Sequence, residues 1–138
     1  MAPGAPGLGR DLADLGRNLL NQGKSSEAEL LLRESIATFE KTAPDDWRSY
    51  DAISLLGAAL LGRGRFLEAE PLVVRGYEGM KAREDRIPAA RKPLLTAAAM
   101  QVVRLYEELG KNDQAKAWKK KLGLADLPVD VFTRPRHE

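Results

Sequence analysis

Few side chains in this sequence have the type and spacing that enzyme chemistry requires. Asp11 with Asp14, and Asp45 with Asp46, are close carboxylate pairs of the kind that can share general acid–base work. Aspartates near an expected helix start normally accept hydrogen bonds from the free backbone N–H groups of the first turn instead. The single histidine, His137, is the penultimate residue, and no serine has a histidine placed to form a catalytic triad. We therefore expect a protein that is not an enzyme.

Metal and redox chemistry lack suitable ligands. The chain has no cysteine and one histidine among its 138 residues. Disulfides, thiolate metal sites and histidine-based metal clusters are thereby excluded. We expect no cofactor and no bound metal.

The charge balance of the chain is nearly even. Lysine and arginine total 22 against 20 aspartates and glutamates, for a net charge of +2, and the pI is about 9.0. This bias is too weak for a dedicated nucleic-acid binder. The most basic stretch comprises Lys116, Lys119, Lys120, Lys121, Arg134 and Arg136. Its one nearby aromatic residue, Trp118, has helical spacing from Ala115 and Leu122, which favours packing over base stacking. We expect no nucleic-acid partner.

Nothing in the sequence indicates a membrane segment. Residues 1–9 are rich in glycine, proline and alanine and lack the basic and apolar regions of a signal peptide. No apolar run approaches the ~20 residues that span a bilayer. We expect a cytoplasmic protein without a membrane partner.

Apolar spacing predicts six helices and no strand. Apolar side chains recur with a period near 3.6, and glycine or proline separates the periodic segments. In the first helix, the predicted apolar stripe consists of Leu12, Leu15, Leu19 and Leu20. The expected helices cover about residues 10–22, 26–43, 47–63 and 66–83, then from the break at 87–93 to 110, and 112–122.

Helix starts can be assigned from polar residues. Ser26 and Glu29 have the spacing of a capping box for the second helix. Asp45 or Asp46 is expected to cap the third helix, and Asn112 the sixth.

A three-residue pattern recurs three times along the chain. A small or apolar residue is followed after 7 residues by glycine and after 5 more by alanine. The alanines are 41 and then 46 residues apart. The three copies are Gly16, Gly23, Ala28; Gly57, Gly64, Ala69; and Val103, Gly110, Ala115. Such periodicity is typical of stacked helical hairpins, which bury their apolar faces against neighbouring units.

This pattern resembles the tetratricopeptide repeat (TPR). Its Leu-Gly positions are matched by Leu15-Gly16, Leu56-Gly57 and Val102-Val103. Its tyrosine position is matched by Leu19, Leu60 and Tyr106. Its small position in the second helix is matched by the three alanines. Val103 departs from the pattern. The spacing exceeds the ~34-residue standard and is similar to the longer repeats of kinesin light chains. The resemblance implies an all-α superhelix.

A further resemblance concerns the amino-acid sequence in and around the second repeat. Five short stretches look like parts of the C-terminal repeat segment of planctomycete-type bacterial serine/threonine kinases. They are Glu68-Ala69-Glu70-Pro71-Leu72, Gly76-Tyr77-Glu78-Gly79-Met80, Pro44-Asp45-Asp46-Trp47, Arg83-Glu84 and Ile87-Pro88. The chain has no glycine-rich loop, His-Arg-Asp or Asp-Phe-Gly motif. Any kinase activity would belong to a parent chain.

The resemblance also implies a concave groove lined by the first helix of each hairpin, where solenoids commonly bind partners. By repeat position the binding residues would be Arg10, Arg17, Asn21, Asp51, Ser54, Ala58, Met100, Arg104 and Glu108, together with Ala13, Gly62 and Ala97. Arg17 and Arg104 would flank an acidic motif through charge-assisted hydrogen bonds. The alternative is that both are ordinary solvated charges. Only Arg104 matches the Lys/Asn/Arg set of chaperone-binding repeats, which disfavours a carboxylate clamp.

Three segments are expected. Residues 1–9 form a disordered N-terminal segment, 10–122 a TPR-like domain with repeats at about 10–43, 47–84 and 89–122, and 123–138 an extended tail. The tail carries Leu124, Leu127, Val129, Val131 and Phe132. We expect it to cover the exposed end of the last hairpin, because terminal repeats need covering. The alternative is a docking segment for another subunit.

The expected function is non-catalytic protein–protein interaction. A preformed groove in an all-α superhelix of three hairpins would bind a peptide or partner helix, including an acidic one. One alternative is a structural subunit docked through its ends or tail, including self-association through the ends of the solenoid. Another is an accessory module of a bacterial serine/threonine kinase.

Overall fold

A computed structural model describes residues 7–123 and contains six α-helices, with no strand in this part of the chain. Two short 3₁₀ turns, Glu84–Arg86 and Ala89–Arg91, connect the fourth and fifth helices. The helices are α1 (Leu8–Asn21), α2 (Ser25–Thr42), α3 (Trp47–Gly62), α4 (Phe66–Ala82), α5 (Lys92–Glu108) and α6 (Asn112–Lys121). The predicted all-α class is confirmed. Residues 1–6 of the predicted N-terminal segment 1–9 and residues 124–138 of the predicted tail 123–138 lie outside the described residues.

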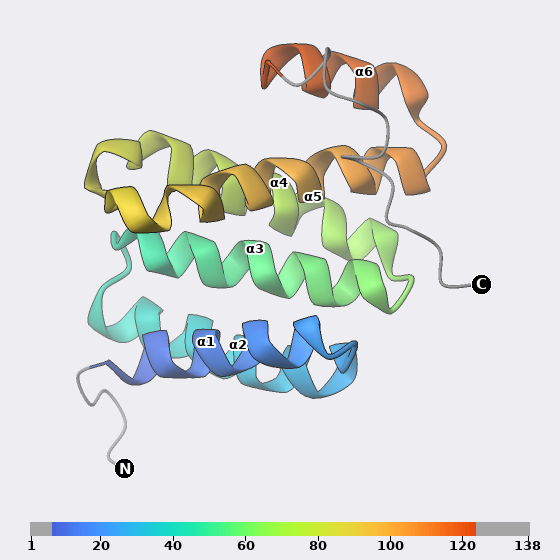
Figure 1. Ribbon diagram of the computed structural model, residues 1–138. Coiled ribbons are helices and arrows are strands. Elements are labelled where there is room, and N and C mark those ends of the chain that lie inside the picture. Colours follow the sequence, from blue (N-terminus) through green and yellow to red (C-terminus); the bar gives the residue numbers. More distant parts are fainter. Residues whose placement is uncertain (1–6, 124–138) are drawn as a thin grey trace.

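The helices form three successive hairpins. α1 packs on α2, α3 on α4, and α5 on α6, and each hairpin also contacts the next. In Figure 1, α1, α3 and α5 follow one another on the near side of the stack, with α2 and α4 behind them and α6 beyond α5. The N-terminal ends of α1, α3 and α5 all point to the same edge, on the left of the view. Within residues 7–123, no helix is both long and apolar enough to cross a bilayer.

The glycine that follows the first helix of each hairpin has the same backbone conformation in all three copies. Gly23, Gly64 and Gly110 have φ values of 77°, 75° and 71°. In each case the N–H of the following residue donates to a carbonyl five residues earlier, as in Arg65 N–H to Leu60 O at 2.9 Å. This is the Schellman motif, in which a left-handed glycine ends a helix and satisfies its free carbonyl groups. The predicted repeat therefore corresponds to a repeated turn.

We expect Gly64→Ala to destabilise the protein by about 1–2 kcal/mol. No atom lies within 4 Å of the position that a Cβ would take at Gly64. The cost therefore comes from the left-handed backbone, which disfavours a Cβ. Urea denaturation checks the value. Gly64→Asn should lose less, because asparagine tolerates this conformation, and equal losses for the two variants would contradict the explanation.

The small residues of the repeat bring the two helices of a hairpin together. A Cβ on Gly16 would lie 2.8 Å from Leu32, and one on Gly57 would lie 2.6 Å from Val73. The alanines of the pattern are also buried, with 0–2% of their surface exposed. The third copy has Val103 in place of glycine, itself fully buried, so α5 and α6 cannot approach in the same way there.

Several local predictions were wrong at the first and last hairpins. α1 begins at Leu8, so Leu8 and Gly9 belong to the helix, where Gly9 packs against Phe39. Leu15 lies outside the buried stripe and is 49% exposed. Leu19 and Leu20 of the predicted stripe do pack against the core, while the fully buried residues of α1 are Gly9, Ala13 and Gly16.

The predicted helix caps were only partly correct. Asp46 caps α3, since its carboxylate accepts from the Arg48 backbone N–H at 2.9 Å. Ser26 lies inside α2, and its predicted partner Glu29 instead accepts hydrogen bonds from Arg33 at 3.0 Å and Arg63 at 2.6 Å. Burial alone would raise the pKa of Glu29, but these arginines outweigh it and lower the pKa. Asn112 is the first residue of α6 and makes no capping bond.

Candidate functional site

The residues predicted to bind a partner all lie on α1, α3 and α5, the helices on the near side of the stack in Figure 1. Arg10, Asn21 and Glu108 are exposed there, as are Gly62 and Ala97. Ala58, Met100 and Arg104 are half-buried. These side chains, from all three hairpins, remain on the surface that a partner can reach.

Three of the predicted binding residues are buried, namely Ser54, Asp51 and Ala13. Ser54 is 4% exposed, because it faces α4 rather than solvent. A Cβ on Gly76 of α4 would lie only 2.6 Å from the Ser54 backbone nitrogen. Asp51 is 7% exposed, and Ala13, at the repeat position of Ser54, is buried as well. Repeat position alone therefore overestimates how much of α3 faces a partner.

Asp51 is instead half of an ion pair that joins the first two hairpins. The Arg17 guanidinium of α1 donates through Nη2 to Oδ2 of Asp51 on α3. The Arg17 side chain is 24% exposed and that of Asp51 is 9% exposed. Burial raises the pKa of Asp51 above its usual value, and the charge of Arg17 opposes that rise. Arg17 therefore stabilises a buried carboxylate of its own chain, which corrects its predicted role towards a partner carboxylate.

The hollow on this face is small. It encloses about 20 Å³ between α1, the start of α3 and the start of α5. It is lined by Arg10, Ala13, Asp14, Arg17, Trp47, Arg48, Asp51, Arg91 and Leu94. That space suffices for about one water molecule, so a peptide cannot enter. Any partner at this point must lie across the surface.

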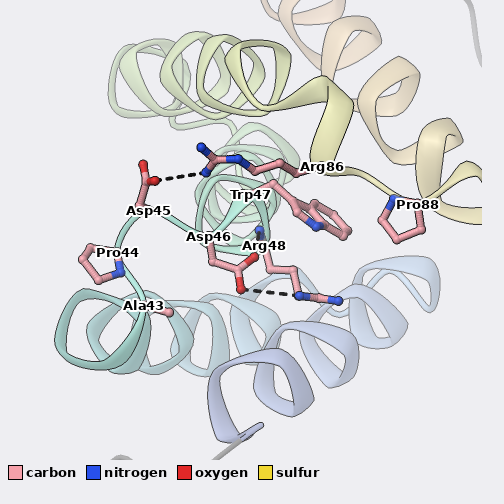
Figure 2. Close-up of a pocket in the computed structure, with 8 residues that line it drawn as sticks. All are labelled: Ala43, Pro44, Asp45, Asp46, Trp47, Arg48, Arg86 and Pro88. Carbon is pink, nitrogen blue, oxygen red and sulfur yellow. Dashed lines mark hydrogen bonds and ion pairs between the residues drawn. The ribbon is translucent and has the colours of Figure 1, made fainter.

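A larger and more open hollow adjoins it at the edge where α3 and α5 begin. It has a volume of about 490 Å³, within the range of ligand sites in proteins. Figure 2 shows that the Trp47 indole and Pro88 lie on one side, with Asp45 and Arg86 on another. The lining residues are Ala43, Pro44, Asp45, Asp46, Trp47, Arg48, Arg86 and Pro88. Because Trp47 and Arg48 line both hollows, the two form one continuous surface.

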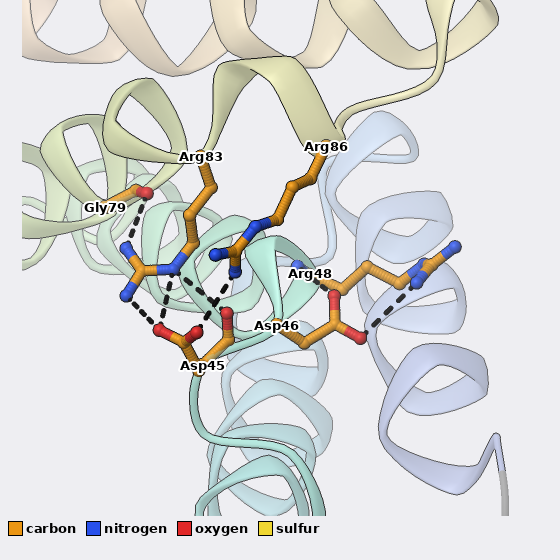
Figure 3. A network of polar contacts seen from close by, with 6 residues as sticks. All are labelled: Asp45, Asp46, Arg48, Gly79, Arg83 and Arg86. Atoms are coloured by element: carbon orange, nitrogen blue, oxygen red, sulfur yellow. Dashed lines mark hydrogen bonds and ion pairs between the residues drawn. The ribbon is translucent and has the colours of Figure 1, made fainter.

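A polar network fixes one wall of this hollow (Figure 3). Asp45, in the loop between α2 and α3, accepts from Arg83 and from Arg86, the latter at 3.0 Å. Hydrogen bonds from the two arginines lower the pKa of Asp45. Arg83 also donates to the Gly79 carbonyl at 3.0 Å and to the Asp45 carbonyl at 2.9 Å. The network ties the second hairpin to the loop that precedes it.

Arg48 lies at the junction of the two hollows. Its guanidinium stacks 5.0 Å from the centre of the Trp47 ring. It also approaches Asp46 at 3.4 Å, a long contact, since Asp46 already accepts the backbone N–H that caps α3. The guanidinium is thus held beside an aromatic ring, with most of its donors free of short hydrogen bonds to described residues.

Sequence reasoning missed the arginines of this edge: Arg48, Arg86 and Arg91. Arg48 is the second residue of α3, Arg91 directly precedes α5, and Arg86 ends the first 3₁₀ turn between α4 and α5. The available signal was that stacked parallel helices bring their N-terminal ends to one edge. Trp47 was predicted to pack where two repeats meet, and it is 5% exposed.

The described residues contain no group of three or more histidine, cysteine, aspartate or glutamate side chains arranged to hold a metal. No protein-family model and no curated protein matches this sequence.

Proposed function

We propose that this chain is a TPR-type protein-interaction module, a right-handed superhelix of three hairpins that binds a partner protein without chemistry or cofactor. The observation that carries the proposal is the threefold repetition of one turn, with a left-handed glycine and a buried alanine at fixed spacing. Stacked hairpins of this kind leave one face of several helices free along the whole array. Here that face belongs to α1, α3 and α5.

The proposed binding face lies around the middle of the stack. Ala58 on α3 and Ala97 on α5 are small, and the face also carries the longer, accessible side chains of Asn21, Met100 and Arg104. Small side chains let a partner helix or extended segment approach the backbone closely. The Arg17–Asp51 ion pair holds α1 and α3 in a fixed arrangement, so a partner binds a preformed surface.

We expect Ala97→Arg to weaken capture of the native partner at least about tenfold, because an arginine would occupy the space that the partner needs. Ala37→Arg is the matched control, since Ala37 is equally exposed but lies on α2. Quantitative affinity capture from lysate of the native host, with the protein at fixed concentration, measures the effect. Equal loss with both variants, or no loss with Ala97→Arg, would contradict binding at this face.

One observation favours a second function, that of a structural subunit docked by its end. Leu15 of α1 is 49% exposed, whereas its repeat counterparts Leu56 and Val102 are 4% and 0% exposed. In the described part of the chain, the second and third hairpins each pack on a preceding hairpin, whereas the first has none before it. An end-docked subunit would cover Leu15 in the same way, so Leu15→Glu would abolish assembly while Ala97→Arg left it intact.

A further inference from the structure

We propose that an acidic segment of the partner protein binds in the 490 Å³ hollow between the α2–α3 loop and the α4–α5 connection, through Arg48 and Arg86, and reaches Arg91 in the adjoining small hollow. This inference rests on the proposed interaction function but places recognition at the edge of the stack, outside the residues predicted from repeat position. The inference is supported by the difference between arginines that form strong ion pairs within the chain and arginines that do not.

Arg86 can be released to a partner at little cost. Its side chain is 59% exposed and makes one hydrogen bond to Asp45. Asp45 keeps its two bonds to Arg83 when Arg86 leaves. Arg83 is itself anchored on the Gly79 carbonyl and stacked 4.3 Å from the centre of the Tyr50 ring. Arg83 is therefore the structural partner of Asp45, and Arg86 is the one that can exchange carboxylates.

Arg48 and Arg91 extend this cationic surface into the neighbouring hollow. Among the described residues, the Arg48 guanidinium makes one polar contact, the long one with Asp46, whose carboxylate also caps the helix, and it stacks on Trp47. Arg91 is exposed and forms no ion pair with any residue in 7–123. The nearby carboxylates are engaged by their own partners, except Asp14, so the free donors of the edge are guanidinium groups. Guanidinium groups bind carboxylates through paired, charge-assisted hydrogen bonds.

The rest of the lining indicates that the acidic segment also carries an apolar side chain. Pro44 and Pro88 line the hollow; Pro88 is exposed and lies beside the Trp47 indole, and Pro44 lies on the other side of the hollow, near Asp45 (Figure 2). Apolar walls beside charged donors are the usual composition of sites that bind peptides with a fixed orientation. The N-terminal ends of α3 and α5 add their positive dipole ends to the same edge.

The test uses the full chain and a fluorescein-labelled peptide of six glutamates and one leucine, followed by fluorescence anisotropy at about 0.1 M salt, where the Debye length is ~10 Å. We expect saturable binding that Arg86→Gln weakens at least about threefold and Arg48→Gln/Arg86→Gln at least about tenfold. Arg75→Gln is the matched control, because Arg75 is exposed on α4 and lines neither hollow. It should change the affinity less than about twofold.

Several outcomes would overturn the proposal. These are the absence of saturable binding, an equal loss with Arg75→Gln, or equally tight binding of a single-stranded oligonucleotide of the same charge, which would indicate a general anion surface. Thermal unfolding of each variant separates lost binding from lost folding, and Arg86→Gln alone leaves Asp45 paired. Ala97→Arg should leave this peptide bound. Its effect on native-partner capture therefore tests the proposed function separately.

Discussion

Replacing Arg17 with glutamine is expected to destabilise the protein by about 3 kcal/mol at pH 7, because it leaves the buried carboxylate of Asp51 without a counter-charge. Asp51 has 9% of its side chain exposed, so water cannot replace the lost partner. Asp51→Asn should cost less than about 1 kcal/mol. In that variant the unpaired Arg17, with 24% of its side chain exposed, can turn to solvent. Urea denaturation of both single variants and of Arg17→Gln/Asp51→Asn measures these values.

The pKa of Asp51 determines how the stability loss of Arg17→Gln changes with pH. The pKa of Asp51 is raised in the folded protein, so the folded state holds its proton more tightly than the unfolded state does. The stability contributed by Asp51 therefore falls as pH rises from the unfolded pKa, near 3.8, through the folded one. Removing Arg17 raises the folded pKa further. The deficit of Arg17→Gln relative to wild type should thus be largest at pH 7 and shrink towards pH 4.

Comparison at equal pH is necessary because other carboxylates act in the opposite direction. The pKa values of Glu29, Asp45 and Glu84 are lowered by their cationic partners. Their contributions are lost as pH falls. A deficit for Arg17→Gln that stayed constant between pH 7 and pH 4 would contradict a buried, ionised Asp51.

Gly76→Ala should destabilise the protein by about 2 kcal/mol, although alanine normally stabilises a helix by ~1 kcal/mol relative to glycine. A Cβ on Gly76 would lie 2.6–2.7 Å from the backbone N and Cα of Ser54. Backbone atoms cannot rotate away, so α3 and α4 would have to separate, and such overpacking typically costs 1–3 kcal/mol. Thermal and urea denaturation of the variant check this value.

Gly62→Ala provides the matched control, as another glycine in the same hairpin with a close neighbour. A Cβ there would lie 2.6 Å from Ser25 Oγ, the end of a short side chain that can change rotamer. We expect a change within about 0.5 kcal/mol. If Gly62→Ala were as damaging as Gly76→Ala, the contact with the Ser54 backbone would not be the cause.

The elements that local sequence determines could be predicted well. Gly23, Gly64 and Gly110 mark the turns because few other residues adopt a left-handed helix end, and that requirement is visible in one residue type at a fixed spacing. Asp46 could be recognised as a cap because its carboxylate can accept a free N–H of the first helical turn, although Asp45 was an equal candidate until the structure placed it against Arg83.

The predicted binding residues depended on information that local sequence does not contain. Whether Ser54 faces a partner or α4 depends on how α3 and α4 cross, which Gly76 permits from 22 residues away. Arg17 and Asp51 are 34 residues apart, and only stacking of the hairpins brings them together. The edge formed by Arg48, Arg86 and Arg91 has the same origin, so a search for motifs along the chain could not assemble it.

The central claim, that the α1, α3 and α5 face binds a partner, is tested most directly by site-specific photo-crosslinking in the native host. A photoreactive amino acid replaces Ala97 on α5 in one strain and the equally exposed Ala37 on α2 in another. After illumination, adducts of the chain are separated by mass and identified. We predict one discrete adduct from position 97 and none from position 37. An adduct from position 37 alone, or the same adducts from both positions, would contradict the account.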